Sequence, residues 1–216
     1  MKLTKVPKYS VAELERRAEQ LIRGRCGWPP SIPVDIESLV DQEPGVLLDI
    51  LPGLQELCGV VGLARYESDT DTMRIIIDAE VADHPSGSFY RFTMAEEFAH
   101  VLLHRNIMAQ VQTLEDLLAL HAWSGYHEID RNAKRLAAAL LMPTITVSRE
   151  ARALYPRLVK AAGFGDPAAV EAHLAERLAR LHGVSAQSMR HRLREWPLRI
   201  TQKVERAMRE RLTVLE

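Results

Sequence analysis

The sequence lacks the features of several large classes of protein. No apolar run approaches the ~20 residues of a bilayer-spanning helix, and residues 1–5 show neither the apolar segment nor the small-residue cleavage site of a secretory signal. The two cysteines, Cys26 and Cys58, lie far apart without C-x-x-C spacing, which favours reduced thiols over a disulfide or a metal pair. These absences predict a cytoplasmic protein without a membrane association.

Glycine and proline are also scarce, at 11 residues each, whereas 47% of the 216 residues are apolar. Such a chain can bury a core as one large domain or two small ones. The net charge of -1 conceals an asymmetry, because residues 145–216 hold 14 Lys and Arg against 8 Asp and Glu, and residues 1–144 hold 14 against 21. A basic segment can bind nucleic acid or an acidic partner, but solvated helix faces often show the same imbalance, so DNA binding is not favoured.

Local signals predict the first helices. Ser10 and Glu13 have the S-x-x-E spacing in which each side chain satisfies a free amide of the first turn, so a helix should run from about residue 11 to residue 23. Three prolines within residues 28–33 predict an extended connector. A short second helix is expected near residues 35–40.

Residues 45–79 consist of β-branched and aliphatic clusters separated by turns at residues 52–53 and 68–71. We expect three strands that form a small, mainly antiparallel sheet. A loop at residues 84–88 then leads into a segment, Phe92 to His104, with apolar residues at helical spacing.

The rest of the chain is predicted to be helical. Helices are expected at residues 113–123 and 128–142, and Pro143 should end the second of them. Asp166 and Ser185 are predicted N-caps of later helices, and the last helix should begin near residue 199.

Three side chains that can bind a metal ion, Glu96, His100 and His104, are spaced four apart and therefore share one side of the predicted helix. Glu97 stands where the zincin motif H-E-x-x-H has its general base, but the first histidine of that motif is missing. Taken alone, an E-E-x-x-H string is most often a solvated helix face, so its context decides its meaning.

Residues 91–104 read R-F-T-x-A-x-E-x-x-H-x-L-L-H, and residues 130–143 read D-x-x-A-x-x-L-A-A-x-L-L-M-P. This pair resembles the ImmA/IrrE family, in which R-F-T-x-A-H-E-x-x-H-x-x-x-H is followed by E-x-x-A-x-x-F-A-A-x-L-L-M-P. Residues 32–36 and 178–193 resemble its amino-terminal signature and its carboxy-terminal helical region. The resemblance implies an α+β, zincin-like metallopeptidase with a metal-binding helix pair, and a protein substrate, often a helix-turn-helix repressor.

The resemblance also implies roles for four residues. His100 matches the second histidine ligand, Glu97 the general base and Asp130 the acidic ligand, while Glu96 takes the place of the missing histidine. Carboxylate oxygens bind Zn²⁺ at ~2.0–2.2 Å, much as imidazole does, so zinc is the expected metal. Two carboxylates and an imidazole cancel the charge of a divalent ion, so the hydrolytic drive should be weaker, and the additional oxygen ligand makes Mn²⁺ the alternative metal.

Two alternatives to this ligand set stay open. His104 forms its own i, i+4 pair with His100, but a shift by one turn would leave Glu97 on the wrong side of the metal. Glu128 competes with Asp130, although two residues along a helix is ~200° of rotation. Asp130 is preferred because it shares its side with small alanines, Ala133 and Ala137.

A further set of side chains can donate a hydrogen bond to a developing oxyanion, and the sequence does not choose among them. They are His84, His121, His127, Tyr90 and Tyr126.

Residues 168–181 and 185–195 form two predicted helices across a glycine-containing turn, which is the layout of a helix-turn-helix. Arg190, Arg192 and Arg194 would contact DNA if the second helix entered a groove. We favour instead a packed helical region, because these charges are interspersed with glutamates and apolar positions are abundant.

The sequence therefore predicts a metallopeptidase-like domain over residues 1–144 and a basic helical region over residues 145–216. The predicted function is metal-dependent hydrolysis of a peptide bond in a transcriptional repressor. The alternative is a catalytically inactive member of the same fold that binds a transcription factor or DNA.

Overall fold

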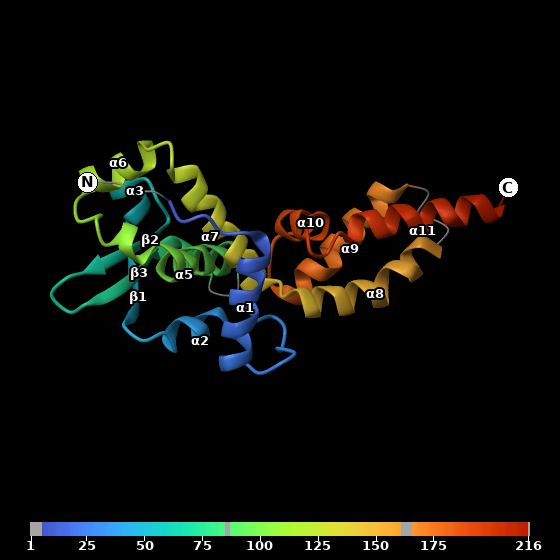
Figure 1. The fold of residues 1–216 in the computed structure, drawn as a ribbon, viewed down its shortest axis with the longest axis horizontal. Coiled ribbons are helices and arrows are strands. Elements are labelled where there is room, and N and C mark those ends of the chain that lie inside the picture. Colours follow the sequence, from blue (N-terminus) through green and yellow to red (C-terminus); the bar gives the residue numbers. More distant parts are fainter. Residues whose placement is uncertain (1–5, 85–86, 161–165, 216) are drawn as a thin grey trace.

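The architecture is given by a computed structural model that describes residues 6–84, 87–160 and 166–215. The molecule is elongated, with the sheet and helices α1 to α7 at one end and helices α8 to α11 at the other (Figure 1). We call these ends the sheet lobe and the helical lobe. Within the described residues, no helix is long and apolar enough to cross a membrane.

The first two helices follow their capping signals. Helix α1 (Val11–Arg25) begins after Ser10, whose side chain accepts a hydrogen bond from the backbone N–H of Glu13 at 3.2 Å. Helix α2 (Ile36–Asp41) begins after Asp35, which accepts from the N–H of Ser38 in the same way. Both caps satisfy amides that have no partner within the first turn of a helix.

The sheet contains β1 (Val46–Leu51), β2 (Gly62–Glu67) and β3 (Thr72–Asp78) in the order β1-β3-β2. Strand β2 pairs antiparallel with β3, but β1 pairs parallel with β3, so the expected antiparallel arrangement is wrong for one of the two pairings. The turn after β1 leads into helix α3 (Leu54–Cys58) rather than into a hairpin. Strand β2 follows α3 and lies on the other side of the position that β3 takes in the sheet. Strand β2 is consequently an edge strand.

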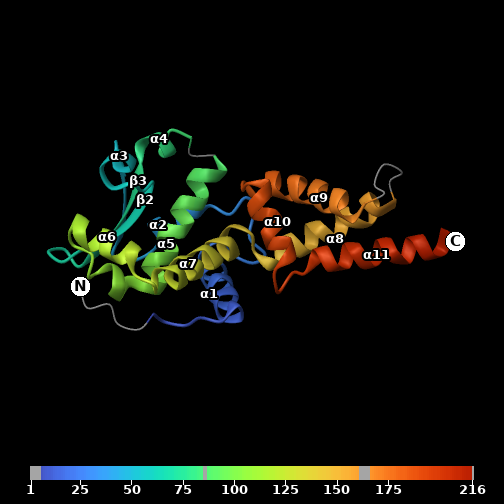
Figure 2. The ribbon, with the colours of Figure 1, turned by 90° about the horizontal axis from the view of Figure 1, so that it is seen from above.

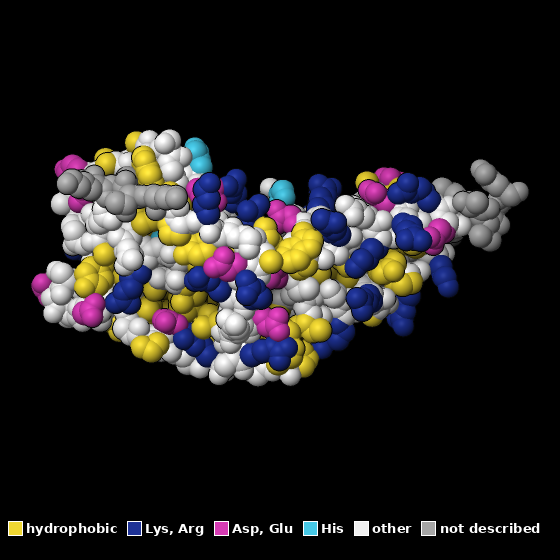
Figure 3. Space-filling view, in the orientation of Figure 1, with side chains coloured by type: hydrophobic (Ala, Val, Ile, Leu, Met, Phe, Trp, Pro, Cys, Tyr) yellow, Lys and Arg dark blue, Asp and Glu magenta, His cyan; other side chains and the backbone are white. Residues whose placement is uncertain are grey.

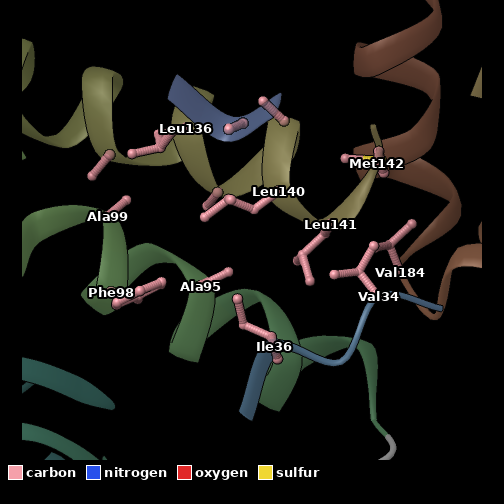
Figure 4. Close-up of a cluster of buried hydrophobic side chains, with 14 of the residues drawn as sticks. Val34, Ile36, Ala95, Phe98, Ala99, Leu136, Leu140, Leu141, Met142 and Val184 are labelled. Atoms are coloured by element: carbon pink, nitrogen blue, oxygen red, sulfur yellow. The ribbon is translucent and has the colours of Figure 1, made fainter. Parts of the chain in front are cut away.

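Helix α5 (Ser88–Met108) lies between the sheet and helix α7 (Tyr126–Leu141), with α4 (Ala79–Ala82) before it and α6 (Leu114–Ala122) after it. Ala95, Phe98 and Ala99 of α5 face Leu136 and Leu140 of α7 in the core of the sheet lobe (Figure 4). Ala133 and Ala137 are also fully buried. The small side chains allow the two helices to approach closely.

The helical lobe begins with α8 (Thr144–Lys160), directly after Pro143. Helix α9 (Pro167–His182) and helix α10 (Ala186–Arg194) meet at a turn in which Gly183 has φ 63°, and α11 (Ile200–Leu215) runs beside α8 and α9 (Figure 2). The side chains of Asp166 and Ser185 cap α9 and α10 as predicted. These elements confirm the α+β fold class with a helical C-terminal region.

A buried arginine joins the two lobes. Arg192 of α10 is 4% exposed and donates to the carbonyl of Met142 at 3.1 Å, to Glu15 of α1 at 2.9 Å and to the hydroxyl of Thr144 at 3.1 Å. We call Glu15, Thr144 and Arg192 the junction cluster. Because one guanidinium binds groups from α1, α8 and the end of α7, it fixes the helical lobe against the sheet lobe.

The other two arginines of α10 also have partners inside the chain. Arg194 donates to the buried Glu171 of α9 at 2.8 Å, and Arg190 lies 3.9 Å from the same carboxylate. Lys and Arg side chains nevertheless gather over the helical lobe on the face shown in Figure 3. The arginines that would read DNA in a helix-turn-helix are thus held by internal contacts.

Candidate functional site

A cleft of about 320 Å³ lies between β2 and α5. Its walls combine apolar side chains, among them Phe92 and Leu120, with the carboxylates of Glu96 and Glu97 and the imidazole of His100. Residues 59–64 form the opposite wall, so the edge strand β2 and the motif helix α5 face one another across the same space.

The close approach of β2 to α5 depends on a glycine. A Cβ at Gly62 would lie 2.6 Å from Cγ2 of Thr93 and 3.0 Å from Oε1 of Glu97, which is closer than ordinary van der Waals contact allows. Any larger residue would push the strand away from the helix. Gly62 therefore allows the edge of the sheet to approach the carboxylate of Glu97.

Glu97 is set up to hold a proton near neutral pH. The pKa of Glu97 is raised to about 8. Burial of the carboxyl group is the largest cause, and the neighbouring charge of Glu96 is the second. A hydrogen bond from the backbone N–H of Ala64 acts in the opposite direction. A carboxyl group with such a pKa suits general acid or base chemistry at neutral pH.

Glu96 of α5 and Asp130 of α7 come together, as the sequence predicted, and a lysine lies against both. The Nζ atom of Lys134 is 2.8 Å from Oδ1 of Asp130 and 3.9 Å from Oε1 of Glu96. Burial raises the pKa of Glu96 to about 7, the Lys134 charge lowers it, and the Asp130 charge and hydrogen bond raise it. The two carboxyl groups thus lie against the same cation.

His100 and His104 form a buried pair at the far side of the cleft. Their Nδ1 atoms are 3.3 Å apart, and burial lowers the pKa of His100 to about 4 and that of His104 to about 3. Both imidazoles are therefore neutral at neutral pH. Within the described residues the Nε2 atom of His104 has no hydrogen-bond partner. His104 thus contacts His100 directly.

A break in α5 accompanies this pair. His104 has φ -128° and ψ 19°, outside the helical range, and the helix resumes after it. The hydroxyl of Tyr9 donates to the carbonyl of Leu103 at 3.0 Å, next to the break. A side chain from the N-terminal segment thereby satisfies a carbonyl near the point where the regular helix is interrupted.

The five suggested oxyanion donors divide into two groups. His121 and Tyr126 line the cleft, and their ring centroids are 4.6 Å apart. Burial raises the pKa of Tyr126 and lowers the pKa of His121, and it is the largest cause of both shifts. Tyr90 instead donates to Glu37 at 3.0 Å, and His84 and His127 are exposed and do not line the cleft. Only His121 and Tyr126 are placed to contact a molecule in the cleft.

Glu128, the alternative acidic ligand to Asp130, lies on the same helix. Glu128 forms an ion pair with Arg131 on α7. Neither residue lines the cleft itself, but Asp130 lies beside Glu96 and lines the adjoining groove, which Glu128 does not. This geometry favours Asp130 over Glu128 as the acidic group of the site.

The observed arrangement does not fit a metal ion. Across residues 6–84, 87–160 and 166–215, no three His, Cys, Asp or Glu side chains are grouped as metal ligands. A positive group, the Lys134 ammonium, already lies against Asp130 and near Glu96, where a divalent ion would need both carboxylates. Since like charges repel strongly in a partly buried site, Lys134 would have to move before an ion could bind.

The α+β fold, with a small sheet, two packed motif helices and a helical C-terminal region, is that of a zincin-like domain followed by further helices. Residues 61–194 match the family Peptidase_M78, IrrE N-terminal-like domain. The chain belongs to this family, as the paired motifs indicated. No curated protein matches the chain.

Lys134 is the important site residue that the sequence reasoning missed. It stands four residues after Asp130, a spacing at which opposite charges meet on a helix. That signal was visible, but it is common on exposed helices. Its contact with Glu96 depends on the packing of α7 against α5, which the sequence does not give.

Proposed function

We propose that this protein binds an extended polypeptide segment of a regulatory protein in the cleft, as a member of the peptidase family that need not cut what it binds. The free edge of β2 carries the proposal, because this edge lies in the same cleft as Glu96 and Glu97. An edge strand offers unpaired N–H and C=O groups to which an extended chain can add as a further strand.

The cleft supplies contacts for side chains as well as for the backbone. Phe89, which is 61% exposed, and Phe92 line it together with Leu117 and Leu120. Apolar side chains of a bound segment would be buried against this wall. Main-chain pairing with β2 would give affinity, and the apolar wall would give specificity.

A basic groove of about 380 Å³ adjoins the cleft and shares Phe92 with it. It is lined by Arg131, Lys134 and Arg135 together with Asp130 and Glu195, and within the described residues Arg135 has no ion pair. A segment that passes Phe92 would meet the guanidinium group of Arg135. The charge favours an acidic side chain at that end, and the family resemblance makes a helix-turn-helix repressor the natural partner.

Selection from a phage-displayed library of linear ten-residue peptides would test the proposal, followed by fluorescence anisotropy with the selected peptide. Phe89→Ala should weaken binding about 5–30-fold, since an aromatic contact of about 1–2 kcal/mol is lost. Leu57→Ala is a matched control, because Leu57 is an exposed apolar residue, at 67%, outside the cleft.

Hydrogen exchange with the same peptide locates the contact. Protection of the β2 amides is the expected result. Equal loss of affinity in both alanine variants, or protection confined to another surface, would show that the cleft is not the binding site.

A second candidate function is the metal-dependent endopeptidase that the sequence analysis predicted. The pKa of about 8 at Glu97 favours it, because a general base should titrate near the working pH. In the family a zinc ion supplies Lewis-acid chemistry for peptide hydrolysis. Mass spectrometry of the selected peptide, incubated with Zn²⁺ or Mn²⁺, would detect cleavage, and Glu97→Gln should abolish it if this function operates.

A further inference from the structure

We propose that the ammonium group of Lys134 takes the place of the catalytic metal ion, as an internal cation that holds Glu96 and Asp130 together and keeps divalent ions out. This inference does not rest on peptide binding. It concerns the charge balance of the site alone.

The geometry places one cation between groups from two helices. Lys134 and Asp130 are one turn apart on α7, and Nζ lies within 2.8 and 2.9 Å of the two carboxylate oxygens of Asp130. Glu96 projects from α5, with its Oε1 atom 3.9 Å from the same Nζ. A metal ion at the site would make the same connection between α5 and α7.

The ammonium supplies positive charge at the point where the two carboxyl groups meet. Nζ of Lys134 lies 2.8 Å from Asp130 and 3.9 Å from Glu96, so a single cation offsets negative charge on both side chains. The side chains of Glu96 and Asp130 are only 19% and 26% exposed, so an unbalanced charge would be poorly solvated.

A histidine at position 96 would not permit this arrangement. An imidazole carries no negative charge to attract an ammonium, whereas the carboxylate of Glu96 does so. The replacement of histidine by glutamate and the presence of Lys134 therefore fit one another. The departure from the H-E-x-x-H motif is the change that a lysine in this position requires.

Removal of the cation should uncover a metal site. In Lys134→Met the aliphatic part of the side chain is kept and the charge is lost, and Lys134 is 52% exposed, so the fold should survive. Arg135→Met is the matched control, because it removes a neighbouring cation that has no contact with the carboxylates. The full chain is incubated with Zn²⁺ or Mn²⁺, desalted and submitted to elemental analysis, and affinity is measured by isothermal titration calorimetry.

Native protein and Arg135→Met should retain almost no metal, whereas Lys134→Met should retain about one ion per chain, with affinity raised at least about 100-fold. Adding His100→Ala to Lys134→Met should abolish the gain. Tight binding of one ion by the native protein, lost in His100→Ala, would overturn the proposal.

Failure of a folded Lys134→Met variant to bind metal would also overturn it, since Lys134 would then not be the group that excludes the ion. Circular dichroism establishes whether that variant is folded, and Lys134→Gln serves in its place if methionine disturbs the helix. Metal retention by Phe89→Ala separates this result from the proposed function, because that variant should weaken peptide binding while it leaves Glu96, Asp130 and Lys134 in place, and it should retain as little metal as the native protein.

Discussion

Two clusters of charged side chains in the described part of the molecule differ in their numbers of acidic and basic groups. In the junction cluster, Arg192 meets one carboxylate, Glu15, and its other donors bind a carbonyl and a hydroxyl. The cleft cluster, which consists of Glu96, Glu97, Asp130 and Lys134, has three carboxyl groups for one ammonium. Excess carboxylates in a partly buried space raise one another's pKa, whereas a matched pair is held by its hydrogen bonds.

This difference separates a structural cluster from a functional one. The junction cluster connects elements that are far apart in the chain and leaves no charge to act on a ligand. The cleft cluster faces open space and retains protons that it can exchange. Unequal numbers of acidic and basic groups, rather than burial as such, mark the site.

Loss of the ion pair between Arg192 and Glu15 in the junction cluster should have the largest effect on stability. Arg192→Ala leaves Glu15 enclosed without its cation and removes the donor to Met142, so the free energy of unfolding should fall by about 3–5 kcal/mol. Urea denaturation followed by circular dichroism measures this. Arg17→Ala, which breaks an exposed pair with Glu13 on α1, should cost no more than about 0.5 kcal/mol. Equal costs would mean that the junction cluster does not stabilise the lobes.

Removal of an ionisable group from the cleft cluster should instead raise the free energy of unfolding. In the folded chain Glu97 keeps its proton up to about pH 8, whereas in the unfolded chain it loses the proton near its ordinary pKa of 4.5. The contribution of Glu97 to stability therefore falls as the pH rises between these values. Glu97→Gln cannot ionise, so it should be more stable than the native protein by about 1–3 kcal/mol at pH 8.

The advantage of Glu97→Gln should shrink toward pH 5, and thermal or urea unfolding at several pH values would reveal it. Glu176→Gln, at an exposed position of α9, provides the control and should leave stability unchanged at every pH. A stability difference that does not vary with pH would contradict the raised pKa of Glu97.

The helical lobe has a buried titratable group of its own, and its effect should be the smallest. His182 lies between the hydroxyl of Thr146 at 3.1 Å and the carbonyl of Leu178 at 2.9 Å, and burial lowers its pKa. The neutral imidazole is favoured in the folded chain, so its contribution to stability is present above about pH 6.5 and is lost as the pH falls below that value.

His182→Gln should therefore lose less of its free energy of unfolding than the native protein does between pH 7 and pH 5. His127→Gln, at an exposed position, should follow the native profile. Unfolding in urea at each pH gives the slopes, and parallel profiles for all three proteins would show that His182 does not contribute to the acid sensitivity.

The sequence predicted those parts of the fold that depend on neighbouring residues. Ser10, Asp166 and Ser185 cap helices because their side chains reach amides within the next three residues, and Pro143 ends α7 because it cannot continue the helix. The side of α7 that carries Asp130 followed from the helical period together with its small alanines.

The parts that the sequence did not predict depend on contacts between distant segments. The parallel pairing of β1 with β3 is set by the path of the chain through α3, and neither strand carries a signal for it. The roles of Arg192 and Lys134 depend on which carboxylates the folded chain brings to them. The metal ligands Glu96, His100 and Asp130 stay a prediction, and the division at residue 144 coincides with the start of α8 but is not tested by it.

The junction cluster has a consequence for the order in which the protein forms during synthesis. Glu15 and Arg192 are 177 residues apart in the chain. At roughly 5–20 residues per second, a ribosome needs about 10–35 s to deliver the second residue after the first. Until then α1 lacks its partner at the lobe boundary, so the first helix to leave the ribosome is among the last elements to reach its final contacts.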